Sequence, residues 1–270
     1  MTPAQTPTPQ QPPQRKPLKV AKTVKELMSM YAADESNKTF NAIILGQIGA
    51  GKTTMLSTAP KPVLIDSFDP GGHKLRTFKP LIESGVIIPD SRWEKPYFKM
   101  FGDWEQELEN RIAGGFFNNI GTYVIDSATT FLQAMKDHTM DKSGRDNVSQ
   151  PEWGAIGTSF IHHVKQCTAL PCNFIMTGHL VLELEESEGK TIARFNSIPS
   201  LQVNIPTLFD EIYVLIQEAK GTGVERKLLT QSTNKYLART RIGAGKFELY
   251  EKPDIAELLR KAELDYKDKV

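Results

Sequence analysis

The feature that most constrains the fold is a short apolar run that leads directly into a glycine-rich turn. The run is FNAIIL at residues 40–45, and the turn reads GQIGAGKTT from Gly46 to Thr54. This segment matches G-x-x-x-x-G-K-[ST], a motif that is meaningful when a strand precedes it and a helix follows it. A helical pattern continues at Met55 and Leu56, so both conditions are met. The alternative is a glycine-rich turn that matches by chance, and this context argues against it.

The residues of this loop are suited to hold a polyphosphate. Glycines at positions 46, 49 and 51 allow backbone dihedrals that turn consecutive amide groups inward, and the following helix adds its positive N-terminal end. Lys52 is expected to neutralise β- and γ-phosphate oxygens, and the Thr53 hydroxyl is expected to hold Mg²⁺. The loop therefore predicts a site for ATP and Mg²⁺. It comprises Gly46, Gln47, Ile48, Gly49, Ala50, Gly51, Lys52, Thr53 and Thr54.

Short apolar runs alternate with helical patterns along the chain. Continuous apolar runs of this length are typical of strands that are buried on both faces of a sheet. They lie at residues 40–45, 63–65, 86–88, 97–101, 123–125, 174–176 and 212–216. After about residue 181, strands and turns predominate. The pattern predicts an α/β fold, a mostly parallel sheet flanked by helices, with β-hairpins toward the C-terminus.

Helices are expected before, between and after these strands. After Thr23, apolar residues recur at i, i+3, i+4 and i+7, and we expect this short helix to pack on the core. Asp103 is expected to cap a second helix. Further helices are expected at Phe131, from Pro151 and after Pro253.

The composition bounds the class of protein. The 270 residues include 39% hydrophobic residues, 33 Lys and Arg, and 32 Asp and Glu, which is ordinary for a globular chain. No apolar run approaches the roughly 20 residues that a membrane span needs. No secretory signal starts the chain, and two cysteines are too few for a disulfide framework. We therefore expect a cytoplasmic protein with no membrane partner.

The N-terminal segment differs from the rest in composition. Six of the 17 prolines fall within the first 17 residues, mixed with Gln and Thr. Such a segment cannot bury enough apolar area to offset its ordering entropy, so it predicts a disordered tail. The expected division of the chain is a tail at 1–20, a short helix at 21–39, a core at 40–262 and a charged end at 263–270.

Acidic residues at strand ends complete the expected site. The strand at 123–125 ends in Asp126, which we expect to bind Mg²⁺ through water. Other strands intervene between this strand and the loop strand, which favours an ATPase over a simple kinase. An ATPase also needs a carboxylate to polarise the attacking water. Asp69 is preferred because the turn formers after it place it at the carboxyl edge of the sheet. Asp66 is the reserve candidate, and a turn-capping role for Asp69 is the alternative.

Four motifs, in this order, resemble the core of the RecA-type recombinases: GQIGAGKTT, VLIDSFD, YVIDSATT and FIMTGH. A closer likeness is to the phage branch, the AAA-domain nucleotide-binding proteins that include core-only RecA-like single-strand annealing proteins. The likeness runs from about Phe40 to Leu259. It implies a Mg²⁺-dependent, DNA-stimulated ATPase that acts as a homo-oligomer on single-stranded DNA in recombination or annealing. A single-stranded DNA-binding protein is a further candidate partner, and host cytoplasm is the implied setting.

The resemblance also assigns a role to His179, at a position where the family has a polar residue that senses the γ-phosphate. From the residues alone, a histidine that ends an apolar strand beside the Asp126 strand has the same reach, and a core histidine is the alternative. The family's usual N-terminal domain and polymerising contact are not recognisable, so a ring or short oligomer is as plausible as a filament. Asp69 is shorter than the Glu expected of the recombinases, which suggests slower turnover.

Two segments would face DNA by the same resemblance. The first is 139–149, which includes Arg145. The second is 180–206, where Phe195 would stack on bases. Four glutamates near the tip of the second segment repel phosphate, so we expect that tip to be a solvated hairpin that points away from DNA.

Residues 220–246 form a more basic segment, with seven basic residues against one acidic residue. It stands out because the first 22 residues carry four basic and no acidic side chains, which leaves the remainder with a net charge of −3. A solvated strand face is an equal alternative to a binding surface. Arg239 and Arg241 are expected on one strand face. The resemblance implies that they act in trans, as fingers on the neighbour's γ-phosphate, and direct contact with DNA is the alternative.

The sequence thus predicts a RecA-like ATPase that acts on single-stranded DNA. A nucleotide-switched adaptor, such as a helicase loader with little ATPase activity of its own, is a second reading. A small-molecule kinase is a third and less favoured one, because it would need an acceptor pocket.

Overall fold

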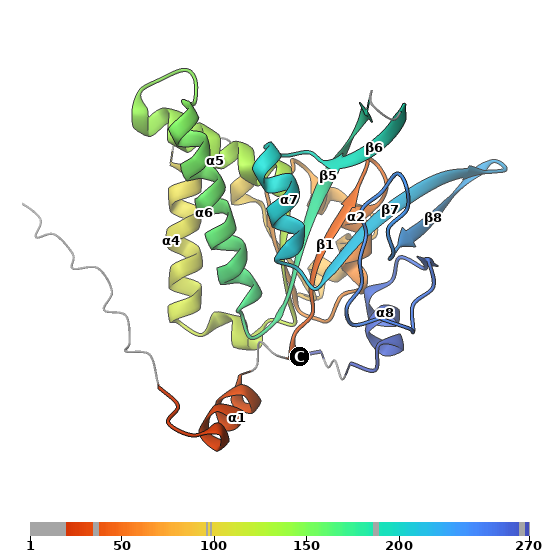
Figure 1. The fold of residues 1–270 in the computed structure, drawn as a ribbon, viewed down its shortest axis with the longest axis horizontal. Helices are drawn as coiled ribbons and strands as arrows, with labels where there is room; N and C mark the ends of the chain where they lie inside the picture. The colour runs from red at the N-terminus through yellow and green to blue at the C-terminus, as the bar shows by residue number, and fades with distance from the viewer. Residues whose placement is uncertain are drawn as a thin grey trace, which may run out of the picture.

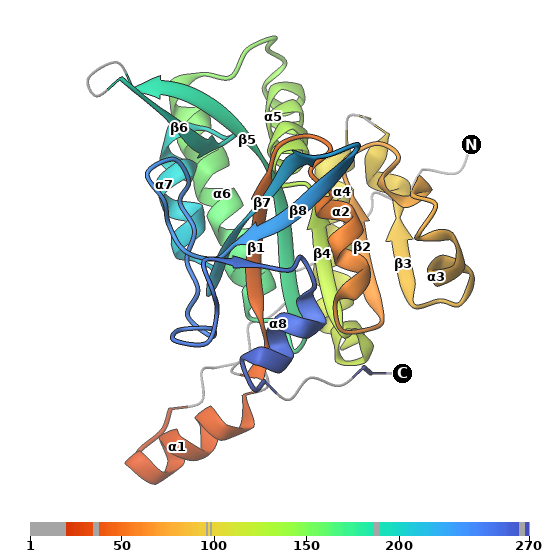
Figure 2. The same cartoon turned by 90° about the vertical axis from the view of Figure 1, so that its right-hand side faces the viewer.

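The structure is a computed structural model, and its described part is an α/β sheet with helices on both faces (Figures 1 and 2). The described residues are 20–34, 38–95, 97, 99–185, 189–264, 268 and 269. The predicted disordered tail lies outside them, apart from Val20.

The sheet has the order β3-β2-β4-β5-β1-β7-β8-β9, and β6 pairs with β5. All pairings from β3 to β7 are parallel, whereas β8, β9 and β6 join antiparallel to their neighbours. The fold class and the hairpins, β5–β6 and β7–β8, are therefore confirmed. The strands are β1 (Asn41–Gly46), β2 (Val63–Ser67), β3 (Ile87–Asp90), β4 (Thr122–Asp126), β5 (Asn173–Glu185), β6 (Lys190–Phe195), β7 (Glu211–Lys220), β8 (Gly223–Leu229) and β9 (Tyr250–Glu251).

The central strands are apolar because both of their faces are covered. All six residues of β1 are buried, and the strand pairs in parallel with β5 on one side and β7 on the other. Alternate residues face different layers: Ile43 and Leu45 pack on one side of the sheet, and Ala42 and Ile44 on the other. This central position aims the end of β1 at the middle of the sheet's carboxyl edge.

Helices form two layers around the sheet (Figures 1 and 2). One layer contains α4 (Met100–Ala113), α5 (Ala128–Ser143), α6 (Gln150–Thr168) and α7 (Pro199–Thr207), whose buried residues share one core cluster. The other contains α2 (Lys52–Met55), α3 (Lys79–Glu83) and α8 (Ile255–Lys261), which pack in or against a second cluster. Short 3₁₀ turns cover Leu56–Thr58, Gly72–Lys74, Ser91–Glu94 and Phe116–Asn119.

The strand predicted at 97–101 is wrong. Met100 and Phe101 form the first turn of α4 and are buried there, and Tyr97 lies outside any strand. An apolar run of this length does not by itself distinguish a strand from a buried helical turn. Trp104 and Leu108, on the same side of the helix as Met100, decide for the helix, which therefore begins three residues before the predicted cap at Asp103.

The expected packing of the first helix is also wrong. Helix α1 (Val24–Ala33) forms as predicted, with Thr23 and Glu26 in a capping box, but none of its residues is buried. Its apolar side chains are mostly exposed, for example Val24 at 76% and Met28 at 67%. Figures 1 and 2 show α1 projecting away from the sheet. Helical spacing gathers apolar residues on one side, but it does not specify the surface that they contact.

None of the helices in the described ranges is long and apolar enough to cross a bilayer.

Candidate nucleotide-binding site

The ends of β1, β2 and β4 meet the middle of β5 at the carboxyl edge of the sheet, beside a cavity of about 390 Å³. Strand β5 lies between β1 and β4, so it separates the phosphate loop from the Asp126 strand. The lining comes from the phosphate loop, the turn after β2, the middle of β5 and the hairpin strand β8. It comprises Ile48, Gly49, Gly51, Lys52, Thr53, Thr54, Asp69, Pro70, Gly71, Gly72, Leu75, His179 and Arg226.

The phosphate loop has the backbone geometry that its glycines predict. Gly49 and Gly51 have φ values of 79° and 101°, which residues with a Cβ rarely adopt. Gly51 caps α2, so the first amides of that helix open toward the cavity. A Cβ at Gly51 would lie 2.9 Å from the Nε of Arg226. Both the positive φ and this close approach therefore disfavour a side chain at position 51.

Lys52 folds back over this loop. Its ammonium group donates to the carbonyl oxygens of Gly46 at 3.0 Å and Gln47 at 3.1 Å, and it lies 3.2 Å from Nδ1 of His179. Burial lowers the pKa of Lys52, and the nearby charges of Asp126 and Asp69 oppose that shift. A bound polyphosphate would give the Lys52 ammonium the negatively charged partner that these neutral carbonyls do not provide.

The residues at the end of β4 fit a hydrated Mg²⁺ ion. The Thr53 hydroxyl donates to Oδ2 of Asp126 at 2.8 Å, and the Thr177 hydroxyl donates to Oδ1. Burial raises the pKa of Asp126, with a further contribution from the charge of Asp69. A carboxylate in this setting gains from a nearby cation, and carboxylate and hydroxyl oxygens are the ligands that Mg²⁺ prefers. Thr53 and Asp126 would hold the ion.

Asp69 and Asp66, the two candidate bases, have different surroundings. Asp69 lines the cavity, where its Oδ1 accepts hydrogen bonds from Ser127 at 2.9 Å and Thr130 at 2.7 Å. Burial acts to raise the pKa of Asp69, but hydrogen bonds, led by the one from His179, hold it below its ordinary range.

Asp66 is fully buried below this edge. It accepts hydrogen bonds from Tyr123 at 2.6 Å, Trp104 at 2.8 Å and Arg111 at 3.0 Å. Burial raises the pKa of Asp66, and Arg111 opposes this shift. These contacts place the reserve candidate in a structural network on the α4 side of the sheet, away from the cavity.

His179 lies between Lys52 and Asp69, the preferred candidate base. Its Nδ1 faces Lys52, and its Nε2 lies 3.2 Å from Oδ2 of Asp69. The ring is 21% exposed and lines the cavity, so the alternative of a core histidine does not hold. The strand order explains this position, because β5 is the neighbour of both β1 and β4.

Glu94 was not found from the sequence. Its Oε1 accepts from Ser67 at 2.8 Å and lies 2.9 Å from Nδ1 of His73, and its Oε2 accepts from the Gly71 amide at 3.0 Å. These contacts fix the turn that carries Asp69. Only the pairing of β2 with β3 brings residue 94 to this turn, and no local motif signals it.

Arg239 and Arg241 lie away from this cavity. The Arg239 guanidinium donates to the carbonyls of Pro206 at 3.2 Å and Phe209 at 2.6 Å, while Arg241 pairs with Asp210 at 2.9 Å. Their segment is not a regular strand, since Arg239 makes an isolated bridge with Ile212. Register places Ile212 beside Ile43, three residues before the phosphate loop. A role in trans stays a prediction.

The expected DNA-facing segments differ from the prediction. Phe195 is 3% exposed and packs in the core at the end of β6, so its base-stacking role is wrong. Residues 139–143 belong to α5, and Arg145 pairs with Glu152 at 2.5 Å. The expected solvated hairpin is present as β5–β6, although its tip at 186–188 lies outside the described residues.

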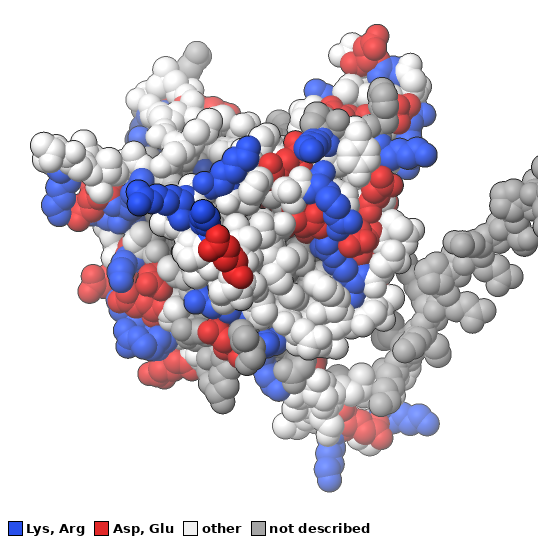
Figure 3. All heavy atoms as spheres, turned by 180° about the vertical axis from the view of Figure 1, so that it is seen from behind, with Lys and Arg blue, Asp and Glu red and all other residues white. Residues whose placement is uncertain are grey.

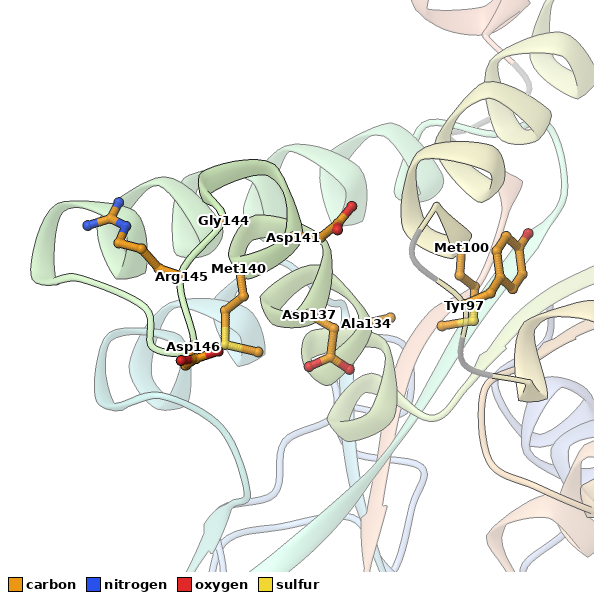
Figure 4. A pocket seen from close by; sticks show the side chains of 9 residues that line it. All are labelled: Tyr97, Met100, Ala134, Asp137, Met140, Asp141, Gly144, Arg145 and Asp146. Carbon is orange, nitrogen blue, oxygen red and sulfur yellow. The ribbon is translucent and has the colours of Figure 1, made fainter.

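A larger cavity, of about 540 Å³, borders the first of these segments (Figure 4). Three carboxylates and one guanidinium line it, which repels rather than attracts a phosphate backbone. It is lined by Tyr97, Met100, Ala134, Asp137, Met140, Asp141, Gly144, Arg145 and Asp146.

Most cations of the basic segment are already paired. Lys220 contacts Glu225 at 2.8 Å, and Lys227 contacts both Glu218 and Glu225. Lys246 contacts Glu263 at 2.8 Å. On the face shown in Figure 3, basic and acidic side chains are interspersed. The count of seven to one along the sequence therefore overstates the positive potential of this surface.

The model of one protein family matches residues 38–242, and its description is an AAA domain. The chain belongs to the AAA domain family. The matched range includes the phosphate loop, Asp69, Asp126 and His179, and the domain is of the P-loop ATPase type. No curated protein matches the chain.

Solved structures similar to this AAA domain include three with low sequence identity. A KaiC-like protein from Pyrococcus horikoshii is 14% identical with a TM-score of 0.41, covering 75% of this chain and 83% of its own. The flagellar accessory protein FlaH from Methanocaldococcus jannaschii is 13% identical with a TM-score of 0.43, covering 78% and 83%. An ATPase of the type III secretion system of pathogenic bacteria is 17% identical with a TM-score of 0.44, covering 66% and 52%.

Proposed function

We propose that this AAA domain protein binds ATP with Mg²⁺ at the cavity beside the phosphate loop and hydrolyses it to ADP and phosphate. The observation that carries the proposal is the placement of Asp126 against Thr53, with Lys52, His179 and Asp69 in contact on the same side. These are the parts that phosphoryl transfer to water requires: positioning, charge stabilisation and a base.

Each residue has a defined task in this mechanism. Loop amides and the Lys52 ammonium hold the β- and γ-phosphate oxygens and offset their charge. Thr53 and Asp126 would hold Mg²⁺, which would supply positive charge to offset the negative charge of the phosphates. Asp69 accepts a proton from the attacking water. His179 orients Asp69 through its Nε2 N–H and faces the Lys52 ammonium with Nδ1, so it would sense the γ-phosphate through these two residues.

At the finer level, we propose that the protein acts as a homo-oligomer on single-stranded DNA in recombination or annealing, within the phage branch and host cytoplasm. The order of the four motifs supports this proposal. Arg239 and Arg241 would then reach a neighbour's γ-phosphate in trans. A single-stranded DNA-binding protein is a candidate partner. Since most described cations at 220–246 are paired, DNA must compete for them or contact the basic N-terminal residues.

One observation favours the second candidate, a nucleotide-switched adaptor. Ser127, Thr130 and His179 all bind the Asp69 carboxylate and keep the pKa of this group low. A carboxylate stabilised in this way is a weaker base, so intrinsic hydrolysis would be slow. Such a protein would hold ATP for a long time and change its contacts when hydrolysis is triggered.

ATP turnover with and without single-stranded DNA tests these proposals, with Lys52→Ala as the blank. Stimulation by DNA supports the recombination proposal, and tight binding with negligible turnover in both conditions supports the adaptor. Failure of the wild type to bind MgATP would overturn both. Mixing Lys52→Ala with an Arg239→Ala/Arg241→Ala variant tests action in trans, because recovered activity requires complementary protomers.

A further inference from the structure

The β7–β8 hairpin extends past the end of the phosphate loop and places one arginine at the nucleotide cavity. Leu215 of β7 lies beside Gly46 of β1, and Gln217, two residues further on, pairs with Arg226 of β8. Arg226 donates from Nε to the Ala50 carbonyl at 2.9 Å and lines the cavity. Its contact with the loop is therefore within the same chain.

Strand alternation explains why Arg226, and not a neighbouring lysine, faces the loop. Leu228 packs in the cluster that contains Ala50 and Met55, whereas Leu229 packs in the cluster on the other face of the sheet. Arg226 is two residues from Leu228 and shares its face, while Lys227 shares the face of Leu229.

The charge of Arg226 is not neutralised within the described part of the chain. Lys220 and Lys227, on the same hairpin, each pair with glutamates, but no described carboxylate lies within 4.0 Å of the Arg226 guanidinium. Its one recorded hydrogen bond uses Nε, so the four N–H bonds on its terminal nitrogens are available to an acceptor in the cavity. A planar guanidinium at that position matches phosphate oxygens.

The position of Arg226 along the cavity indicates which phosphates it would meet. The γ-phosphate belongs near His179, Asp69 and Asp126, which come from β5, the turn after β2, and β4. Arg226 comes from β8, on the opposite side of β1 in the strand order, and packs against Gly51. It therefore faces the end of the site where the α- and β-phosphates lie.

We propose that Arg226 is a nucleotide-binding residue that contacts the α- and β-phosphates in cis and closes the β8 side of the site. The inference rests on the proposed nucleotide-binding function. It adds that the binding of ATP and the binding of ADP both depend on this contact.

The test measures the binding of MgADP and of a slowly hydrolysed MgATP analogue by calorimetry, using the full chain. Arg226→Gln is expected to weaken both nucleotides by a similar factor, roughly tenfold, as for the loss of one charge-assisted hydrogen bond. Steady-state ATPase should show a raised KM with kcat unchanged, because the contact is the same in the ground and transition states. Lys227→Gln, which removes the same charge from the opposite face, is the matched control and should change neither affinity by more than about twofold.

The other outcomes distinguish failure of this inference from failure of the proposed function. Wild-type affinity in Arg226→Gln, with lost binding in Lys52→Ala, overturns the inference and leaves the proposed function standing. A variant that only melts earlier without nucleotide, with affinities unchanged, shows that Arg226 merely braces Ala50 and also overturns it. Loss of ATP binding with normal ADP binding contradicts the assignment of Arg226 to the α- and β-phosphates. If the wild type binds neither nucleotide, both proposals fall.

Discussion

Replacing Asp66 by Asn tests whether this residue, near the end of β2, stabilises the fold or takes part in catalysis. Asp66 is buried, and three donors bind its carboxylate: Tyr123, Trp104 and Arg111. Asn keeps the shape and can still accept from Tyr123 and Trp104, which share one oxygen. Its amide group or its uncharged oxygen then faces the Arg111 guanidinium, which loses the fully buried one of its three carboxylate partners.

The cost follows from this loss. Breaking a buried ion pair by removing one partner costs about 3–5 kcal/mol. Arg111 retains Asp90 at 2.7 Å and Glu107 at 3.3 Å, so the lower end of this range is expected for Asp66→Asn. For a chain of this size, about 3 kcal/mol corresponds to a fall in Tm of roughly 6–12 °C.

The assay combines thermal denaturation with ATP turnover per folded molecule, measured well below the lowered Tm. Asp66→Asn should be much less stable, yet its kcat should stay within about twofold of wild type, because Asp66 does not line the cavity. Asp69→Asn should show the opposite: near-normal stability and a loss of kcat of about 10²-fold or more, the usual contribution of a general base. An Asp66→Asn protein with normal Tm and abolished turnover would refute this reasoning and make Asp66 the catalytic base.

Three further predictions follow from single contacts. Thr130→Ala removes a hydrogen-bond donor that lowers the pKa of Asp69, so the pKa of Asp69 should rise. The acid limb of the kcat–pH profile should then move to higher pH, and an unmoved limb would show that Asp69 is not the titrating base. Glu94→Gln weakens the acceptor for the Gly71 amide and so loosens the turn that carries Asp69. We expect kcat to fall on the order of tenfold and the affinity for ADP, measured by calorimetry, to stay unchanged. Loss of ADP affinity would contradict this prediction. Phe195→Ala should cost about 3–5 kcal/mol in urea denaturation without altering the affinity of folded protein for single-stranded DNA; a stable variant with lost DNA binding would restore the stacking role.

The fold class and the phosphate loop were predictable because their determinants are local. Gly49 and Gly51 have the positive φ that glycine adopts readily, and the strand and helix beside the loop are adjacent in sequence. Asp126 and His179 were also predictable, since each follows a buried apolar run and parallel strands place the carboxyl ends of such runs together; Asp126 ends β4, and His179 makes the last parallel pair of β5 with β1.

Features that depend on which surfaces meet were not predictable. Helix α1 has the apolar spacing of a packed helix, yet its apolar side is exposed. Phe195 follows Arg194 in a segment that suggested base stacking, but the pairing of β6 with β5 turns its ring into the core. The basic count at 220–246 ignored acids on the neighbouring strand, such as Glu218 on β7.

The sequence by itself determined an α/β chain with a phosphate-binding loop and an acid at the end of a second buried strand, because dihedral preference and hydrophobic period act over a few residues. Only the tertiary structure separated Asp69 from Asp66 and brought Glu94 and Arg226 to the site. Asp66 and Asp69 lie three residues apart, yet one is buried against α4 and the other lines the cavity. Strand pairing joins residues distant in the chain, and burial and charge at a point in space depend on all of the segments that meet there.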